Sequence, residues 1–138
     1  MVVVDGKGLP LGVSITSASP AEVKLALPTL STVAVPRVGR PRCNPERLIT
    51  DRAYDSDPLR RALARRGIEL ICPHRSNRTR PRTQDGRKLR RYRRRWVIER
   101  TIAWFGAFRR LVVRYERLTL MYLAFFHLAS AIIALRWL

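Results

Sequence analysis

The sequence predicts an α/β fold in which an N-terminal β-hairpin and a β-α-β unit are followed by long C-terminal helices. Two apolar, β-branched runs flank a glycine-containing turn at the start of the chain, and two further apolar runs flank a proline-initiated helical stretch near its middle. From about residue 88 onward, helix-forming residues dominate. The length of 138 residues and the hydrophobic fraction of 46% suit one domain with a modest core.

The first predicted element is a hairpin of residues 1–4 and 9–16, joined by the turn Asp5-Gly6-Lys7-Gly8. The motif Ser19-Pro20-Ala21-Glu22 has the pattern of a capping box, which predicts a short helix from Pro20 to about Leu27. Pro28 is expected to end this helix, because proline has no backbone N–H. Residues 35–46 contain three prolines and three arginines and predict a loop.

A β-α-β unit is predicted next. Residues 48–50 form its first strand, Asp57 caps the helix with Pro58 at the first helical position, Gly67 ends the helix, and residues 68–72 form the second strand. Asp51 directly follows the first strand. Open α/β sheets present catalytic and ligand-binding groups at the carboxyl ends of their strands, so Asp51 is a candidate functional residue.

A strongly basic segment separates this unit from the C-terminal helices. Residues 74–95 contain eleven Lys or Arg and one acid, Asp85. Residues 74 to about 91 are predicted to form a basic loop whose first half is mobile. Helical character is expected to start near Lys88. Helices then occupy about 92–138, and the first of them continues to about Phe108.

Residues 118–135 contain no charged side chain and approach the length of a membrane span, which leaves a small membrane protein as one alternative class. On a helix, however, Thr119, Tyr122, His127 and Ser130 fall within one arc of roughly 140°. This polar stripe predicts a helix that packs on the rest of the protein, with its other faces buried.

The charge of the chain indicates a polyanionic partner. Lys and Arg number 28 against 10 Asp and Glu, and the net charge of +18 favours nucleic acid. Arginine dominates, and its planar guanidinium matches pairs of phosphate oxygens better than an ammonium group does. Cys43 and Cys72 are expected to be free thiols in a reducing cytosol, because Cys72-Pro73-His74 lacks the second half of a zinc site. The N-terminus lacks the basic region of a signal peptide.

A candidate functional face lies on the helix after the basic loop. In helical projection, Tyr92, Arg95, Gly106 and Arg110 fall within about 40° of Glu99, whereas residues 97, 101, 104 and 108 lie on the opposite side. Two interpretations of Glu99 follow from this placement alone. It is either a surface acid in charge relations with neighbouring arginines or a functional carboxylate.

The spacing of Tyr92, Arg95 and Glu99 resembles the Y-R-E signature of bacterial insertion-sequence transposases of the DDE type. Residues 47–56 are similar to the segment that holds the second aspartate of this family, and residues 95–101 to the one that holds its glutamate. Residues 108–116 and the early hairpin at 5–12 also resemble the family. The resemblance therefore covers nearly the whole chain.

This resemblance implies a partial ribonuclease-H-like fold and an activity that cleaves DNA strands and transfers them. It implies three carboxylates around two Mg²⁺ or Mn²⁺ ions, with Asp51 and Glu99 as catalytic metal ligands. It also implies catalytic roles for Arg95, which would hold a phosphate near the metals, and for Tyr92, which would lie beside the DNA backbone. The implied partner is double-stranded DNA at the element ends and target, in the bacterial cytoplasm at the nucleoid, without membrane association.

Two features depart from the family pattern. A lysine follows the family's glutamate after six residues, whereas this chain has Gly106 there, and Arg109 or Arg110 is expected to supply the cation. The family's first aspartate precedes the early hairpin, and Asp5 is a poor substitute because its setting is a turn. We therefore expect residues 1–138 to be a single, truncated catalytic domain that is inactive alone. Its expected partner is the upstream transposase portion or a second copy.

The main alternative is a non-enzymatic, basic DNA-binding protein that uses the same basic segment. Both interpretations expect the cations of this segment, together with Arg110, to contact DNA phosphates. The expected DNA contacts are Arg75, Arg78, Arg80, Arg82, Arg87, Lys88, Arg90, Arg91, Arg94, Arg95 and Arg110.

Overall fold

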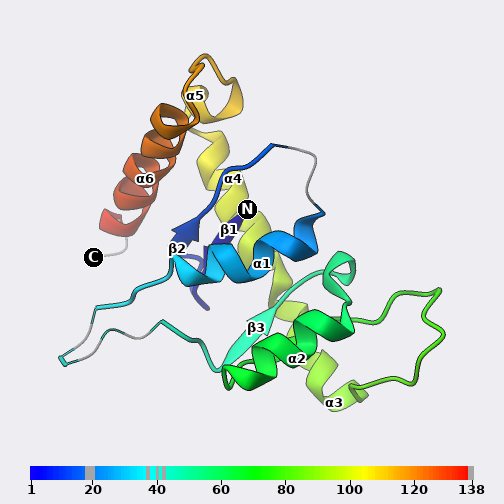
Figure 1. Ribbon diagram of the computed structural model, residues 1–138. Helices are drawn as coiled ribbons and strands as arrows, with labels where there is room; N and C mark the ends of the chain where they lie inside the picture. Colours follow the sequence, from blue (N-terminus) through cyan, green and yellow to red (C-terminus); the bar gives the residue numbers. More distant parts are fainter. Residues whose placement is uncertain (18–20, 37, 40, 42, 137–138) are drawn as a thin grey trace.

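The computed structural model describes residues 1–17, 21–36, 38–39, 41 and 43–136 and shows a mixed α/β arrangement (Figure 1). Its strands are β1 (Val2–Val4), β2 (Pro10–Val13), β3 (Arg47–Ile49) and β4 (Glu69–Ile71). Its α-helices are α1 (Glu22–Ser31), α2 (Asp57–Arg65), α3 (Gly86–Leu89), α4 (Trp96–Gly106), α5 (Arg109–Val112) and α6 (Thr119–Leu135). Two 3-10 segments, η1 (Arg52–Tyr54) and η2 (Arg90–Arg95), complete the order. The predicted sequence of hairpin, β-α-β unit and C-terminal helices is confirmed.

β1 and β2 form the predicted antiparallel hairpin, with Val3 opposite Gly12, although both strands are shorter than predicted. The Asp5 carboxylate accepts hydrogen bonds from the backbone N–H groups of Lys7 and Leu9, each 2.8 Å long. Local bonds of this kind are why aspartate is favoured in turns. Asp5 therefore has the turn role that its sequence setting predicted.

The predicted end of α1 is wrong. The helix does not stop at Pro28 but continues to Ser31 with the proline inside it. Pro28 costs α1 a backbone hydrogen bond. Packing compensates, because Ala26, Thr29 and Leu30 on the same turns are buried at 5%, 0% and 2% exposure.

The helix starts also differ from the predicted caps. Ala21 precedes α1 and makes no side-chain cap bond, while the predicted cap at residues 19 and 20 lies outside the described residues. At α2 the cap is Ser56, whose side chain accepts a hydrogen bond from the Leu59 N–H at 3.5 Å. Asp57 was predicted as this cap, but it is the first helical residue and binds the Arg78 guanidinium at 2.8 Å instead.

The β-α-β unit is confirmed, since β3 and β4 pair in parallel with α2 between them. The strands cover residues 47–49 and 69–71, within two residues of the predicted bounds. Gly67 ends the helix with a φ of 71°, the left-handed conformation that glycine adopts without steric cost. Leu63 of α2 and Ile71 of β4 are fully buried, and Leu63 belongs to one core cluster with Ala26 and Leu30 of α1.

The single helix predicted from about residue 88 to Phe108 is divided into α3, η2 and α4, and α5 follows it. Five of the six residues of η2 are arginine, and like charges at helical spacing destabilise an α-helix. α4 ends at Gly106, so Arg110 lies on α5. The prediction that Arg110 shares a helix face with Glu99 is therefore wrong. The packing side of α4 is confirmed, because Val97 and Thr101 are buried.

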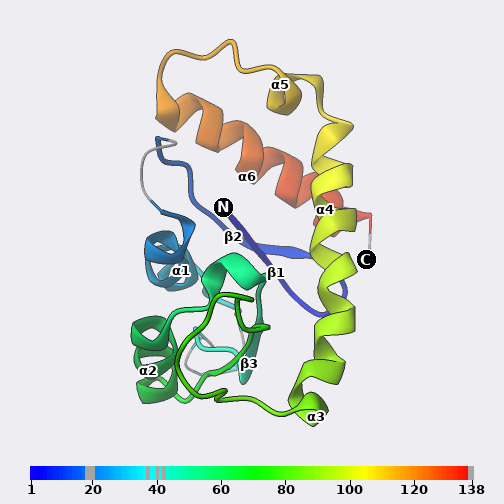
Figure 2. The same cartoon turned by 90° about the vertical axis from the view of Figure 1, so that its right-hand side faces the viewer.

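The helices α1 and α4 lie on opposite sides of the hairpin (Figure 2). η1 contacts α1, and η2 contacts β3. In the part of the chain that the structure describes, no hydrogen-bonded ladder joins the β1–β2 sheet to the β3–β4 sheet. The two sheets are therefore held in place by the helices that pack on them.

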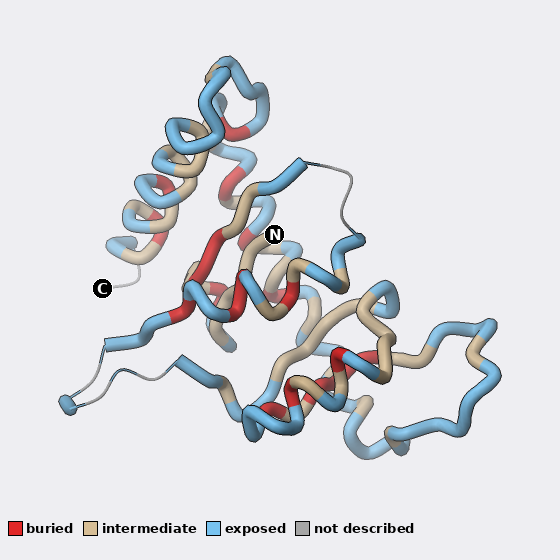
Figure 3. Tube along the Cα trace, viewed as in Figure 1, coloured by how far each residue is buried: buried red, intermediate tan, exposed pale blue. Residues whose placement is uncertain are grey.

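α6 packs on β2, α4 and α5 along one side only. Ala129 and Ile133 are buried there, whereas Leu120, Leu128 and Leu135 are 76%, 58% and 67% exposed. Figure 3 shows buried and exposed positions alternating along this helix. The predicted burial of the other faces of this helix is wrong, because the structure places no element over them among the described residues. No described helix combines the length and the apolar character that crossing a membrane requires.

Candidate active site

Asp51 lies where β3 ends and η1 begins. Its Oδ1 atom accepts a hydrogen bond of 2.9 Å from the Ala53 N–H, so the carboxylate caps the 3-10 turn. This local bond orients the side chain at the start of η1. The position at the carboxyl end of a parallel strand agrees with the sequence prediction.

Glu99 lies on the first turns of α4, four residues after Arg95. The two side chains form an ion pair between Arg95 Nη2 and Glu99 Oε1 and are 37% and 56% exposed. The Arg95 guanidinium also lies over the Tyr92 ring, 5.9 Å from its centroid. Tyr92 and Arg95 at the end of η2 and Glu99 on the first turn of α4 thus form one contiguous group.

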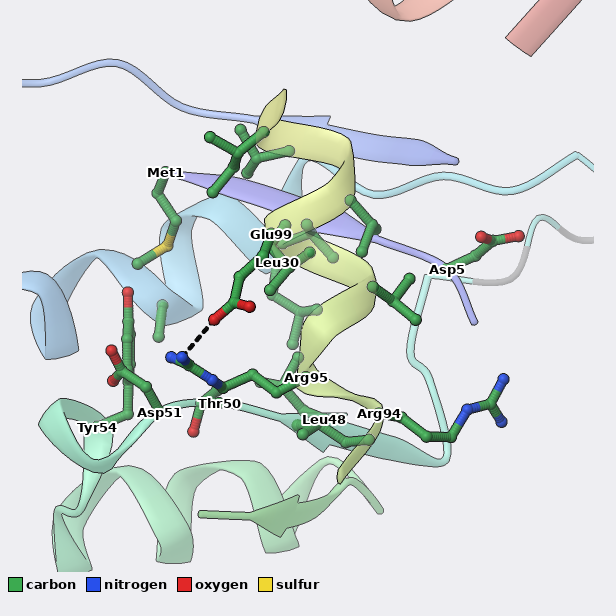
Figure 4. A pocket seen from close by; sticks show the side chains of 18 of the residues that line it. Met1, Asp5, Leu30, Leu48, Thr50, Asp51, Tyr54, Arg94, Arg95 and Glu99 are labelled. Carbon is green, nitrogen blue, oxygen red and sulfur yellow. Dashed lines mark hydrogen bonds and ion pairs between the residues drawn. The ribbon is translucent and has the colours of Figure 1, made fainter. Parts of the chain in front are cut away.

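Asp51, Arg95 and Glu99 line the same groove, which has a volume of about 880 Å³. In Figure 4 the Arg95 guanidinium lies between the two carboxylates and points to Glu99. The groove is bounded by residues of β1, β3, α1 and α4. The fold therefore brings together two acids that are 48 residues apart in the sequence (99 minus 51).

Two further residues of this groove, Glu22 and Tyr54, were missed by the sequence analysis. Burial raises the pKa of the Tyr54 phenol, and the negative charges of Glu22 and Asp51 raise it further, to about 12. Glu22 belongs to the predicted capping box, and nothing in its local sequence indicates that α1 brings it to the groove that Asp51 lines. The end of the groove near Asp51 is consequently acidic.

The carboxylates at the Asp51 end of the groove are suitable ligands for a hard cation. Carboxylate oxygens are the ligands that Mg²⁺ and Mn²⁺ prefer. Among the described residues, however, no group of three His, Cys, Asp or Glu side chains is arranged to hold a metal ion. Asp5 does not join Asp51 and Glu99 as a third carboxylate, because it lies at the opposite end of the groove (Figure 4).

The predicted DNA-contacting cations fall into two groups. Some bind the protein itself: Arg78 and Arg80 pair with Asp57, Arg75 binds the Ala53 carbonyl, and Lys88 pairs with Glu69. Arg94 binds the Gly6 carbonyl at 3.0 Å and Arg110 pairs with Glu116 at 3.0 Å. The exposed cations of the basic segment include Arg82, Arg87, Arg90 and Arg91.

The first half of the basic loop is anchored by Asp55, whose side chain is only 2% exposed. This carboxylate binds Arg60 at 2.9 Å, His74 at 3.0 Å and Arg78 at 3.4 Å, and it accepts a hydrogen bond from the Arg75 N–H at 2.9 Å. Burial by itself raises the pKa of Asp55, but the hydrogen bonds from Arg75, Arg60 and His74 outweigh burial and lower it to about 2. The sequence predicts a mobile first half of this loop and gives no indication of these contacts.

Both cysteines are free, Cys43 exposed and Cys72 buried. Burial raises the pKa of the Cys72 thiol, whose Sγ donates to the Asp51 carbonyl at 3.0 Å. His74 Nδ1 contacts the Asp55 carboxylate at 3.0 Å, and His74 Nε2 accepts a hydrogen bond from the Thr83 N–H at 3.0 Å. These contacts give Cys72 and His74 structural partners on either side of the Asp51 turn.

Residues 1–134 match the family model described as the transposase DDE domain. The chain is also 39% identical, over 136 residues, to a Burkholderia cepacia protein described as a transposase for insertion sequence element IS402. The match covers 96% of this chain and 60% of that relative, so the chain spans less than two thirds of its length. No solved structure matches the chain. The family match and this relative show that the chain belongs to the DDE transposases of bacterial insertion sequences.

Proposed function

We propose that the chain is part of a ribonuclease-H-like catalytic domain that cleaves DNA strands and transfers them with the help of Mg²⁺ or Mn²⁺. The observation that carries this proposal is the meeting of Asp51 and Glu99 in one groove, with Arg95 between them. The hairpin and the parallel β-α-β unit, followed by a helix that carries Glu99, support the fold. Family membership supports the reaction.

In this proposal Asp51 and Glu99 would hold the divalent ions, which would supply charge stabilisation for phosphoryl transfer. Arg95 pairs with Glu99 and neutralises its charge, as a bound cation would. Arg95 would hold a phosphate oxygen beside these carboxylates, because a guanidinium donates paired hydrogen bonds to phosphate. Tyr92 limits the directions open to Arg95 by lying under its guanidinium.

The proposed site is incomplete in this chain. Two carboxylates supply only part of an octahedral oxygen set, and the described residues include no third acid arranged with them for a metal. The third carboxylate would come from the upstream transposase portion or from a second copy. The chain alone is therefore expected to bind metal weakly and to leave DNA uncut.

The site is tested by measuring Mn²⁺ binding, followed through the electron paramagnetic resonance signal of the free ion. Loss of an outer partner of a metal ligand already costs roughly 10-fold to 100-fold in affinity. Asp51→Asn and Glu99→Gln should therefore each weaken binding by about tenfold or more. Asp85→Asn is the matched control, because Asp85 is an exposed cap of α3 and asparagine caps equally well.

Two outcomes would change the proposal. Equal Mn²⁺ affinity in the wild-type chain and all three variants would exclude Asp51 and Glu99 as ligands. Nicking of duplex DNA by the chain alone, lost in Asp51→Asn and in Glu99→Gln, would support the site but contradict its incompleteness.

A non-enzymatic DNA-binding protein is the second candidate, supported by the net charge of +18. Both candidates predict that duplex DNA binding weakens steeply with salt. Replacing Arg82, Arg87, Arg90 and Arg91 by serine should lower the slope of log affinity against log salt by about 0.9 for each DNA phosphate that is no longer neutralised. Fluorescence anisotropy of a labelled duplex measures this slope. An unchanged slope would exclude these arginines from the interface, and Mn²⁺ binding separates the two candidates.

A further inference from the structure

The turn that carries Asp51 is too short to be stable by itself. η1 has three residues, and it closes with two hydrogen bonds of 3.2 Å, from the Tyr54 N–H to the Asp51 carbonyl and from the Asp55 N–H to the Arg52 carbonyl. Bonds of the 3-10 type have poorer geometry than those of an α-helix, and a single turn fixes many dihedral angles for few bonds. The direction of the Asp51 carboxylate therefore depends on contacts from outside the turn.

The chain that follows β4 supplies these contacts through two side chains. The Cys72 Sγ donates to the Asp51 carbonyl at 3.0 Å. Arg75 donates from Nη2 to the Ala53 carbonyl at 2.6 Å and from Nε to the Arg52 carbonyl at 3.5 Å. Burial raises the pKa of the Cys72 thiol, so this group keeps the proton that it donates. Three successive carbonyl groups of the turn are thus held by Cys72 and Arg75.

The peptide group between Arg52 and Ala53 connects Arg75 to Asp51. A trans peptide is planar, so its C=O and its N–H point in opposite directions. The C=O of this peptide faces Arg75 Nε, and its N–H donates to Asp51 Oδ1 at 2.9 Å. The next peptide is held through the Ala53 carbonyl by a charged donor, and such bonds are roughly twice as strong as neutral ones. Arg75 therefore restricts rotation of the N–H group that orients the Asp51 carboxylate.

Arg75 is itself anchored and differs from its neighbours in what it binds. Its backbone N–H donates to Asp55 Oδ2 at 2.9 Å, and the Asp55 side chain is almost fully buried. Arg78 and Arg80 in the same loop pair with the carboxylate of Asp57. The guanidinium of Arg75 binds backbone carbonyls of the turn instead. This choice of acceptors links Arg75 to the geometry of the turn.

We propose that Arg75 is a positioning residue for the Asp51 carboxylate and is not a contact to DNA phosphates. The proposal rests on the proposed function, in which Asp51 holds a divalent ion. Two neighbouring carbonyl groups suit the rigid fork of a guanidinium, whereas the ammonium of a lysine is a point charge on a flexible stem. Lysine at position 75 should therefore keep the charge but lose the positioning.

The first measurement is ¹⁵N relaxation of the whole chain, without metal or DNA. A rigid backbone amide has an order parameter of about 0.85, and a flexible one falls below about 0.6. The Ala53 amide should be rigid in the wild type and flexible in both Arg75→Gln and Arg75→Lys. Arg61→Gln is the control for loss of one charge, because Arg61 is an exposed residue of α2. An Ala53 amide that stays rigid in both Arg75 variants would overturn the proposal.

Mn²⁺ binding measures the consequence for the candidate site. Loss of an outer partner of a metal ligand costs roughly 10-fold to 100-fold in affinity, so Arg75→Gln and Arg75→Lys should each weaken binding about tenfold. In the Asp51→Asn background, Arg75→Gln should have no further effect, because the carboxylate that it orients is absent. A loss that persists there would contradict a role through Asp51. If Asp51→Asn alone leaves the Mn²⁺ affinity unchanged, the proposed function fails, while the relaxation data still decide whether Arg75 holds the turn.

Duplex DNA binding tests the competing role of Arg75. Arg75→Gln should leave the slope of log affinity against log salt as in the wild type. Arg82→Gln, which removes an exposed cation of the same segment, should lower this slope by about 0.9. A similar fall in Arg75→Gln that Arg75→Lys restores would assign Arg75 to a phosphate contact and overturn the proposal.

Discussion

Replacement of Asp55 by alanine is expected to lower the free energy of unfolding by about 3–5 kcal/mol, because it removes one partner from a buried ion cluster. The side chains of Arg60, His74 and Arg78 are only 11%, 8% and 11% exposed. Without the carboxylate, two guanidinium groups and a ring nitrogen are left in this poorly solvated space. Urea unfolding followed by circular dichroism measures the loss.

The pH dependence of the unfolding free energy separates the contribution of the Asp55 charge from that of its packing. A carboxyl whose pKa falls from 3.8 to about 2 on folding adds stability above pH 4 that is lost as the pH falls toward 2. The full contribution is about 2 kcal/mol. The difference in unfolding free energy between the wild type and Asp55→Asn should therefore shrink between pH 5 and pH 2.

A control for this prediction is Glu46→Ala, which removes an acid whose side chain is 71% exposed and lies 3.8 Å from Arg47. Exposed pairs contribute about 0–1 kcal/mol, so this variant should unfold close to the wild type. A loss below about 1 kcal/mol for Asp55→Ala would show that the cluster is not needed to hold the loop.

The Asp55 cluster also matters for the candidate site. The Arg75 guanidinium binds the Ala53 carbonyl, and the Ala53 N–H in turn binds the Asp51 carboxylate. Asp55 orders the segment that contains Arg75 by accepting the Arg75 N–H. A chain of contacts thus leads from the buried cluster to the turn that orients Asp51.

The local part of this arrangement was accessible from the sequence. A strand just before Asp51, a stop at Gly67 and the buried side of α4 at Val97 and Thr101 all follow from short-range patterns, and the structure confirms them. Each depends on residues within a few positions of one another. The same patterns placed Glu99 on the polar face of α4, because helical spacing fixes which residues share a face.

The long-range part was not accessible. The Asp55 cluster joins residues about 20 positions apart through a loop with no periodic pattern, so the loop was predicted to be mobile. Glu22 reaches the groove only because α1 packs across β1 and η1. The end of α1 was misplaced because burial of Leu30 outweighs the local effect of Pro28, and burial cannot be read from one helix alone.

The docking of the hairpin on α4 provides the second large prediction. Gly8 has a φ of 92°, and a Cβ there would lie 2.9 Å from Thr101 Oγ1 and 3.1 Å from Arg100 Nη2. The buried Thr101 hydroxyl donates to the Gly8 carbonyl at 2.7 Å. Gly8→Ala should therefore combine backbone strain of about 1–2 kcal/mol with overpacking of about 1–3 kcal/mol, measured by the same urea unfolding.

Gly67→Ala separates these two contributions. Gly67 also has a left-handed φ, 71°, but a Cβ there would meet nothing within 4 Å, so its replacement should cost only the backbone strain. The excess loss in Gly8→Ala then measures the contact with α4. Because that contact sets the position of β1 against α4, which carries Glu99, the variant should also weaken Mn²⁺ binding, whereas Gly67→Ala should not. Equal losses of stability in both variants would show that the hairpin docks on α4 without depending on this close approach.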